Sequence, residues 1–230
     1  MRRVISVLLV LLAGLAVVAW RFPLDRIVPA RIPGLEVESV SGTIWAGEVR
    51  GARYQGLALG DVDLALLPRT LLSGTPQVRF DRLQGPISGR VWLSREKRRV
   101  EGVTGELALP LGRTGLSARV EMAGVALETD LAGNCRLVEG AVEATLTGVP
   151  VIGTTPALAG TPLCDGNAVM VPLAMPDGSM GLDLALQPDR RWRGDLSLRV
   201  PNPLLRALLG TAGFTLADDR ATLSVAGSLG

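Results

Sequence analysis

The chain has 230 residues, of which 47% are hydrophobic and 20% are charged, and its formal net charge is +2. It contains no histidine and only two cysteines, which excludes Ser-His-Asp and Cys-His nucleophilic sites, histidine-ligated zinc and cysteine-rich metal sites. Aromatic residues make up 3% while Gly numbers 28 and Pro 15, a composition typical of many short strands joined by turns.

The chain begins with an apolar run, residues 4–20, that carries no charged side chain. As a helix this run would reach about 25 Å, just enough to cross a bilayer, and Trp20 and Arg21 are typical of a membrane interface. A cleaved signal peptide is the alternative, with Val17-Val18-Ala19 as the cleavage site. We favour a single-pass anchor within residues 1–22 that holds the bulk of the chain in the periplasm at a bacterial inner membrane. The anchor residues are Val4, Leu8, Leu12, Leu15 and Trp20.

Residues 23–34 contain three prolines and predict a stalk, because proline interrupts a continuing helix. From Leu35 onward the hydrophobic period changes to two, which indicates antiparallel strands with one buried face. We therefore predict a mainly β protein in which residues 35–230 form a meandering, curved antiparallel sheet. Two similar segments, Ser41–Val49 and Ser88–Glu96, each contain a tryptophan expected in the core, with ligand stacking as the alternative. This echo hints at two sheet halves, 35–110 and 111–230.

Two segments are exceptions with helical signals. Residues 68–72 fit a single turn that begins at a proline. Residues 202–210 begin with Asn202 as a capping residue and Pro203 at the first helical position, and they end at a glycine. We expect the leucines of this second helix to cover an open end or edge of the sheet, with contact to a membrane surface as the alternative.

The two cysteines, Cys135 and Cys164, enclose 28 residues. A metal or redox pair would need closer spacing, such as Cys-x-x-Cys, whereas an exported chain would place the pair in an oxidising compartment. We predict a disulfide that ties the strands of residues 136–148 to the segment that begins at Asp165.

No catalytic constellation emerges from the charged residues. Carboxylates such as Asp61 and Asp63 alternate with apolar residues along a strand, which favours a solvent-facing row over a catalytic pair. The basic run of residues 95–99 is interrupted by Glu96 and predicts a hairpin tip, so no nucleic-acid partner is expected. We expect no catalytic residue, metal site or cofactor.

The cluster Gly42–Gly47, Gly-Thr-Ile-Trp-Ala-Gly, gives the chain its resemblance to a known family. It is followed by a Leu-rich run ending at Pro68 and by Leu71-Leu72-Ser73-Gly74. With the apolar start and the Pro-rich stalk, the chain resembles the type II secretion system protein N family, although Asp63 stands where the family usually has an aromatic residue. The motif residues are Gly42, Trp45, Gly47, Pro68 and Gly74.

The resemblance implies an accessory inner-membrane component of the machine that moves folded periplasmic proteins across the outer membrane. Its expected partners are other inner-membrane and periplasmic secretion subunits, and the family carries over no catalytic residues. The competing hypothesis is an AsmA-like lipid-handling protein, in which a curved sheet offers an apolar trough to acyl chains. A continuous apolar channel would favour lipid, and a closed core would favour a scaffold. An enzyme is the third alternative.

Overall fold

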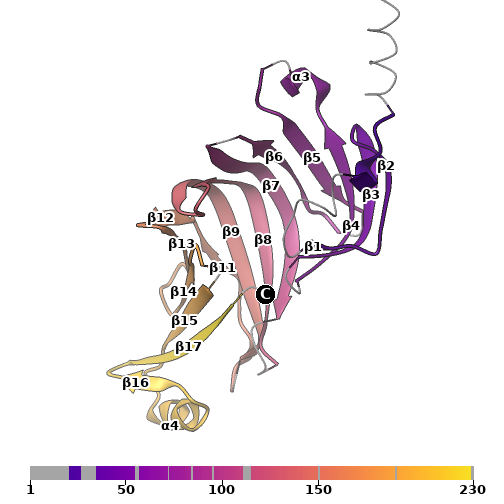
Figure 1. The fold of residues 1–230 in the computed structure, drawn as a ribbon. Coiled ribbons are helices and arrows are strands. Elements are labelled where there is room, and N and C mark those ends of the chain that lie inside the picture. Colours follow the sequence, from indigo (N-terminus) through magenta and orange to yellow (C-terminus); the bar gives the residue numbers. More distant parts are fainter. Residues whose placement is uncertain are drawn as a thin grey trace, which may run out of the picture. The chain divides into compact units, whose positions relative to one another are not determined.

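The structure is a computed structural model that describes residues 21–26, 35–54, 57–71, 73–83, 85–94, 96–110, 115–149, 151–189 and 191–228. The chain forms two compact units, Met1–Gln84 and Gly85–Gly230, which are considered separately (Figure 1). The predicted anchor residues lie outside the described residues. Within the described part, no helix has the length and apolar character needed to cross a bilayer.

The first unit is a small antiparallel sheet in which β1 and β2 both pair with β3, β3 pairs with β4, and β4 pairs with β5. A 3-10 helix precedes the strands, and a single helical turn separates the last two, as predicted from Pro68. The elements are η1 (Leu24–Arg26), β1 (Leu35–Glu36), β2 (Ser39–Thr43), β3 (Ala46–Tyr54), β4 (Leu57–Leu66), α3 (Pro68–Leu71) and β5 (Gln77–Arg82).

One face of this sheet is apolar. Val49 lies opposite both Val40 and Val62, and the buried side chains of Leu24, Val49 and Ala52 form its core. Leu24 comes from η1 and is 6% exposed. The beginning of the predicted stalk is therefore part of the folded unit, because its short turn supplies a core side chain.

The second unit is a longer antiparallel sheet. Strands β6 to β9 pair in sequence order, β9 pairs with β10 and β11, and the sheet then continues from β11 through β13, β14, β15 and β17 to β16. The first strands are β6 (Ser88–Leu93), β7 (Lys97–Pro110), β8 (Ser117–Asp130), β9 (Cys135–Val149), β10 (Gly153–Thr154) and β11 (Leu158–Gly160). They are followed by β12 (Leu163–Asp165), β13 (Ala168–Ala174), β14 (Met180–Leu186), β15 (Arg191–Arg199), α4 (Pro203–Thr211), β16 (Thr215–Ala217) and β17 (Arg220–Ser228).

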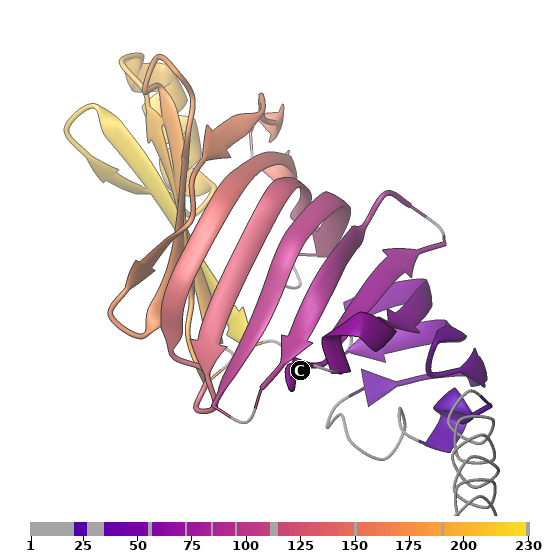
Figure 2. The ribbon, with the colours of Figure 1, turned by 90° about the horizontal axis from the view of Figure 1, so that it is seen from above.

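The prediction of a mainly β, antiparallel and curved fold is confirmed. Strands β7, β8 and β9, however, have 14, 14 and 15 residues and are longer than the short strands expected (Figure 2). The register shifts beside Gly102 and Gly124, which have φ of +63° and +64°. Extra residues at such bulges bend a strand and increase its twist, which accounts for the curvature.

The core of the second unit is a single apolar cluster contributed by β8, β9, β11, β13, β14, β15, β17 and the segment around α4. Asn202 caps α4 as predicted, since its side-chain oxygen accepts hydrogen bonds from the backbone N–H groups of Leu204 and Leu205 at 2.9 and 3.4 Å. The helix continues past the expected glycine to Thr211. Leu209 on its inner side is completely buried, so the helix does cover part of the core.

The sequence echo does not correspond to a structural repeat. Trp45 lies in the turn between β2 and β3, whereas Trp92 lies within β6 and donates its indole N–H to Glu101 at 2.8 Å. Both side chains are half-buried, so the expectation that they are core residues is wrong. The boundary between the two units falls at Gln84 and not near residue 110, because β7 pairs with β8 along its whole length.

Candidate functional site

The Gly42–Gly47 motif forms the hairpin between β2 and β3, where the two glycines are paired across the strands. Gly42 has φ of +84°, and a Cβ atom there would lie 2.5 Å from the carbonyl oxygen of Ala46. A Cβ on Gly47 would contact a methyl group of Leu24. The motif therefore consists of glycines because the hairpin is tight and because η1 packs directly on it.

Backbone hydrogen bonds also link the turn of this hairpin to Phe22, just before η1, and to β4. The backbone N–H of Ile44 donates to the carbonyl of Phe22 at 3.1 Å, and the N–H of Leu66 donates to the carbonyl of Ile44 at 2.9 Å. Pro68 then begins α3, and Gly74 ends the following turn with φ of +74° and open space around it. The structure thus gives the motif residues structural positions in the first unit and brings none of them together as a chemical site.

The polar face of the first unit carries a row of three carboxylates. Glu48 lies opposite Asp63, and Asp63 lies opposite Asp81, at the base of a shallow groove of about 410 Å³. Like charges in directly opposed strand positions destabilise a sheet. Two arginines offset this repulsion, because Arg50 pairs with Glu48 at 2.7 Å and Arg79 pairs with Asp81 at 3.1 Å.

Of the predicted solvent-facing pair, Asp63 is exposed as expected, whereas Asp61 is half-buried. The Asp61 carboxylate accepts the backbone N–H of Gly51 at 2.9 Å, a structural contact at the bulge of β3. Among the described residues, no group of three His, Cys, Asp or Glu side chains has an arrangement that could hold a metal ion. The groove is therefore a charged surface feature of the sheet.

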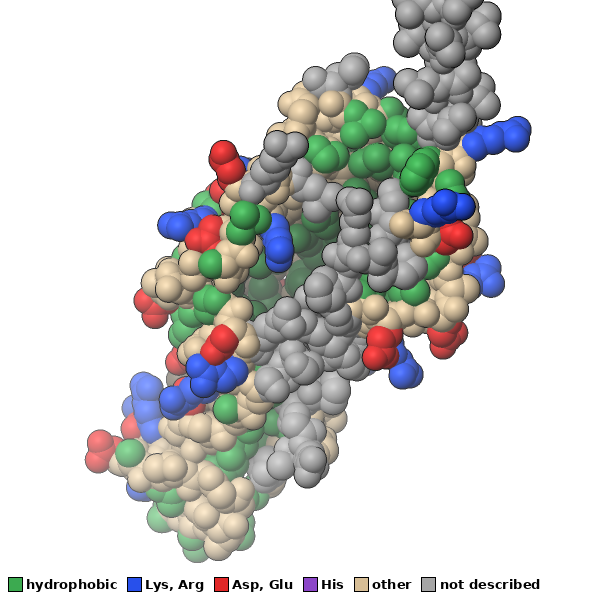
Figure 3. Space-filling view, in the orientation of Figure 1, with side chains coloured by type: hydrophobic (Ala, Val, Ile, Leu, Met, Phe, Trp, Pro, Cys, Tyr) green, Lys and Arg blue, Asp and Glu red, His purple; other side chains and the backbone are tan. Residues whose placement is uncertain are grey.

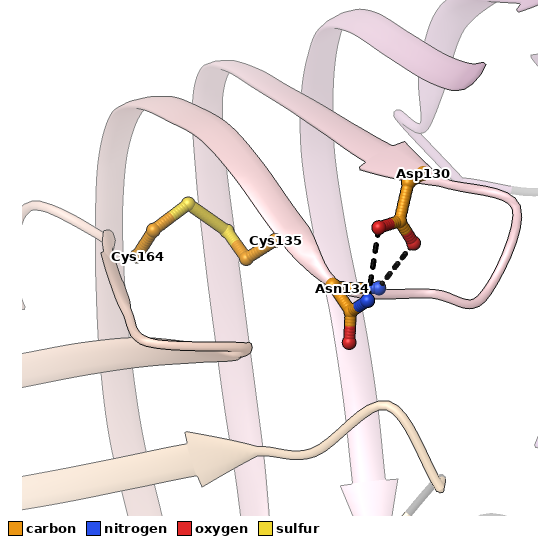
Figure 4. Close-up of a disulfide and its surroundings, with 4 residues drawn as sticks. All are labelled: Asp130, Asn134, Cys135 and Cys164. Carbon is orange, nitrogen blue, oxygen red and sulfur yellow. Dashed lines mark hydrogen bonds between the residues drawn. A yellow bond between two sulfur atoms is a disulfide. The ribbon is translucent and has the colours of Figure 1, made fainter. Parts of the chain in front are cut away.

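The predicted disulfide between Cys135 and Cys164 is present and joins the start of β9 to β12 (Figure 4). Cys135 is 6% exposed, and its backbone N–H donates to the carbonyl of Asn167 at 3.1 Å. The bond ties a short peripheral strand to one of the longest strands in the sheet. This agrees with the predicted link between residues 136–148 and the segment at Asp165.

The turn before Cys135 is held by a single carboxylate. Asp130 accepts hydrogen bonds from the backbone and the side chain of Asn134, both at 2.9 Å (Figure 4), and it pairs with Arg136 at 2.9 Å. The bonds from Asn134, followed by the contact with Arg136, lower the pKa of Asp130 to about 2. Hydrogen bonds to the charged form explain the direction of this shift.

An exposed row of leucines lies on α4. Leu204 is 76% exposed and Leu208 is 55% exposed, and they are one helical turn apart, while Leu205 is partly exposed beside them. Figure 3 shows hydrophobic side chains at the surface in this part of the second unit. The sequence predicted that these leucines would cover the sheet, and for Leu204 and Leu208 that prediction is wrong. Leu209 packs in the core cluster, and a helix presents only one side to a core, so Leu204 and Leu208 lie on the outer side.

A second feature that sequence reasoning missed is the outer edge of β17. This strand pairs with β15 over all nine of its residues but with β16 only at Arg220, Ala221 and Thr222. No local signal in the sequence marks such an edge, because it depends on which distant strands pair.

The described residues define an antiparallel β-sheet protein with an intrachain disulfide, an exposed leucine row and a partly unpaired sheet edge. The family model of the type II secretion system (T2SS) protein N matches residues 33–224, and the chain belongs to this family. The match extends over nearly all the strands of both units. A search of curated proteins and a search of solved structures each found no match.

Proposed function

We propose that this chain is an inner-membrane-anchored, periplasmic accessory subunit of the type II secretion system that acts through protein–protein contacts. Family membership supports a role in this system. The apolar run of residues 4–20 supports an anchor, and the disulfide between Cys135 and Cys164 supports an oxidising compartment such as the periplasm.

The observation that carries a non-catalytic role is the way the polar residues are used. In the described part of the chain, charged side chains pair with one another along exposed strand faces, as Arg193 does with Asp195 at 2.9 Å and Arg199 with Asp219 at 2.8 Å. Such pairs contribute little to stability and leave the carboxylates charged and solvated. With no histidine in the sequence, a general base would have to come from a carboxylate, from Lys97 or from Tyr54.

A scaffold is favoured over a lipid conduit by the packing of the second unit. The side chains of Leu158, Leu209 and Ala221 are completely buried and belong to one continuous cluster. Between β8 and β17 the apolar side chains thus pack against one another and against Leu209 of α4. An acyl chain would need an open apolar channel along that face.

The proposal is tested by deleting the gene in its own bacterium and measuring where an exported protein accumulates. We expect the exported protein to accumulate in the periplasm and the full chain to restore its release. We also expect the detergent-solubilised full chain to co-purify with other inner-membrane secretion subunits. A chain in which residues 1–20 are replaced by a cleavable export signal is the matched control and should restore release poorly. Normal release in the deletion strain, together with no co-purifying subunit, would contradict the proposal.

A further inference from the structure

The outer edge of β17 offers backbone hydrogen-bonding groups for which the described residues provide no partner strand. Residues 223–228 of β17 have β15 on one side, and β16 ends opposite Thr222. The strand and the short β16 beside it are visible in Figure 1. Within the described part of the chain, six consecutive residues of β17 therefore pair on one side only.

The register shows which groups point outward from this edge. The N–H of Val200 donates to the carbonyl of Asp219 at 2.7 Å, so this pair belongs to the hydrogen-bonded set between β15 and β17. Hydrogen-bonded and non-bonded pairs alternate along an antiparallel ladder. Val225 therefore bonds to β15, whereas the backbone N–H and C=O groups of Ser224 and Ala226 face away from it.

The edge lacks the features with which proteins block strand addition. Residues 223–228, Leu-Ser-Val-Ala-Gly-Ser, contain no charged residue and no proline, and the pairing with β15 is continuous without a bulge. The outer strand of the first unit differs, because Pro23 forms a bridge with Thr43 of β2 and η1 packs beside it. Among the residues that the structure describes, the edge of β17 is thus uncovered, whereas the edge at β2 has Pro23 and η1 beside it.

We propose that residues 223–228 of β17 bind an extended segment of another secretion subunit by strand addition. This inference rests on the proposed function, since it takes the partner from the same system. The edge of six residues is much smaller than the roughly 20–30 residues that each side contributes to a stable interface between folded proteins. It therefore fits a flexible segment of a partner held nearby better than a second copy of this chain.

The side chains of β17 define what the added segment should contain. Leu223 and Val225 pack against the core cluster, whereas Ser224 and Ala226 are exposed on the opposite face. Side chains alternate across a strand, so the incoming segment should carry apolar residues on the first face and small or polar residues on the second.

The test is hydrogen exchange measured by mass spectrometry on the full chain in detergent. The probes are the purified periplasmic domains of the other inner-membrane secretion subunits from the same bacterium, added one at a time. We expect one of them to slow exchange of the Ser224 and Ala226 amides by at least ~10-fold, since addition of a strand hydrogen-bonds these groups. Ala226→Pro removes the outward N–H without touching the ladder to β15 and should weaken binding about tenfold. Ala226→Ser retains the N–H and should bind as the wild type does.

The outcomes separate this inference from the proposed function. A subunit that binds without protecting these amides, and with the same affinity for the Ala226→Pro chain, would overturn the edge proposal and leave the secretion role standing. No binding by any subunit would overturn both. Protection that appears in the chain alone and grows with its concentration would assign the edge to a second copy and overturn the proposal. The wild-type measurement decides the matter even if the proline variant does not fold.

Discussion

Removal of the disulfide should destabilise the second unit by an amount that the structure allows us to work out. Cys135 and Cys164 are separated by 29 positions, and closing a loop of that length stabilises the fold by about 3.6 kcal/mol in the chain-entropy model. Both cysteines should be replaced by alanine, because a serine at the buried position of Cys135 would add the cost of an unpaired hydroxyl group.

The assays are urea unfolding and thermal unfolding of the full chain in a mild detergent, both monitored by circular dichroism. The double alanine variant should show a lower midpoint, and its melting temperature should fall by roughly 7–14 °C for a unit of this size. The wild-type chain with reductant should behave like the variant. A variant whose free energy of unfolding lies within ~1 kcal/mol of the wild type would refute the reasoning that the bond constrains the unfolded chain.

Three further predictions concern packing, charge and burial. Gly47→Ala should destabilise the first unit by about 1–3 kcal/mol, because the new methyl group overlaps Leu24 of η1. The control Gly194→Ala meets only ordinary contacts and should cost less than ~1 kcal/mol. Equal losses of stability for the two variants in thermal melts would contradict this prediction. The carboxyl of Asp130 has a pKa lowered to about 2, so the stability it contributes should be complete above about pH 4 and lost as the pH falls toward 2. An NMR titration of Asp130 with a midpoint near the ordinary pKa of an aspartate would contradict this prediction. Leu209→Ala should cost about 2–5 kcal/mol and Leu204→Ala less than ~0.5 kcal/mol in urea unfolding, and the reverse order would contradict the assigned orientation of α4.

Features encoded over short distances could be predicted from the sequence. The alternation from Leu35 onward gave the strands, and Asn202 followed by Pro203 gave the start of α4, since capping depends on residues at fixed offsets. The disulfide followed from two cysteines in a chain expected to be exported. The strands and the helix cap depend on residues only a few positions apart, and two cysteines can form only one intrachain disulfide.

Features that depend on long-range pairing could not be predicted. The row Glu48, Asp63 and Asp81 exists only because three strands pair in one register, and the sequence shows three separate alternations. The similarity between the segments Ser41–Val49 and Ser88–Glu96 gave a wrong prediction, because the two similar sequences adopt different backbone conformations. The positive φ of Gly42 allows a hairpin around Trp45, whereas Trp92 continues along its strand.

The most direct test of the central claim is photocrosslinking of the full chain in native membranes. Photoreactive residues would be placed at the exposed positions Leu204 and Ala226 and, for comparison, at Leu184 on the inner face of the second unit. We predict adducts with type II secretion subunits from the exposed positions and no phospholipid adduct from Leu184. Phospholipid adducts from Leu184, with no protein adduct from the exposed positions, would contradict the scaffold account and favour a lipid conduit.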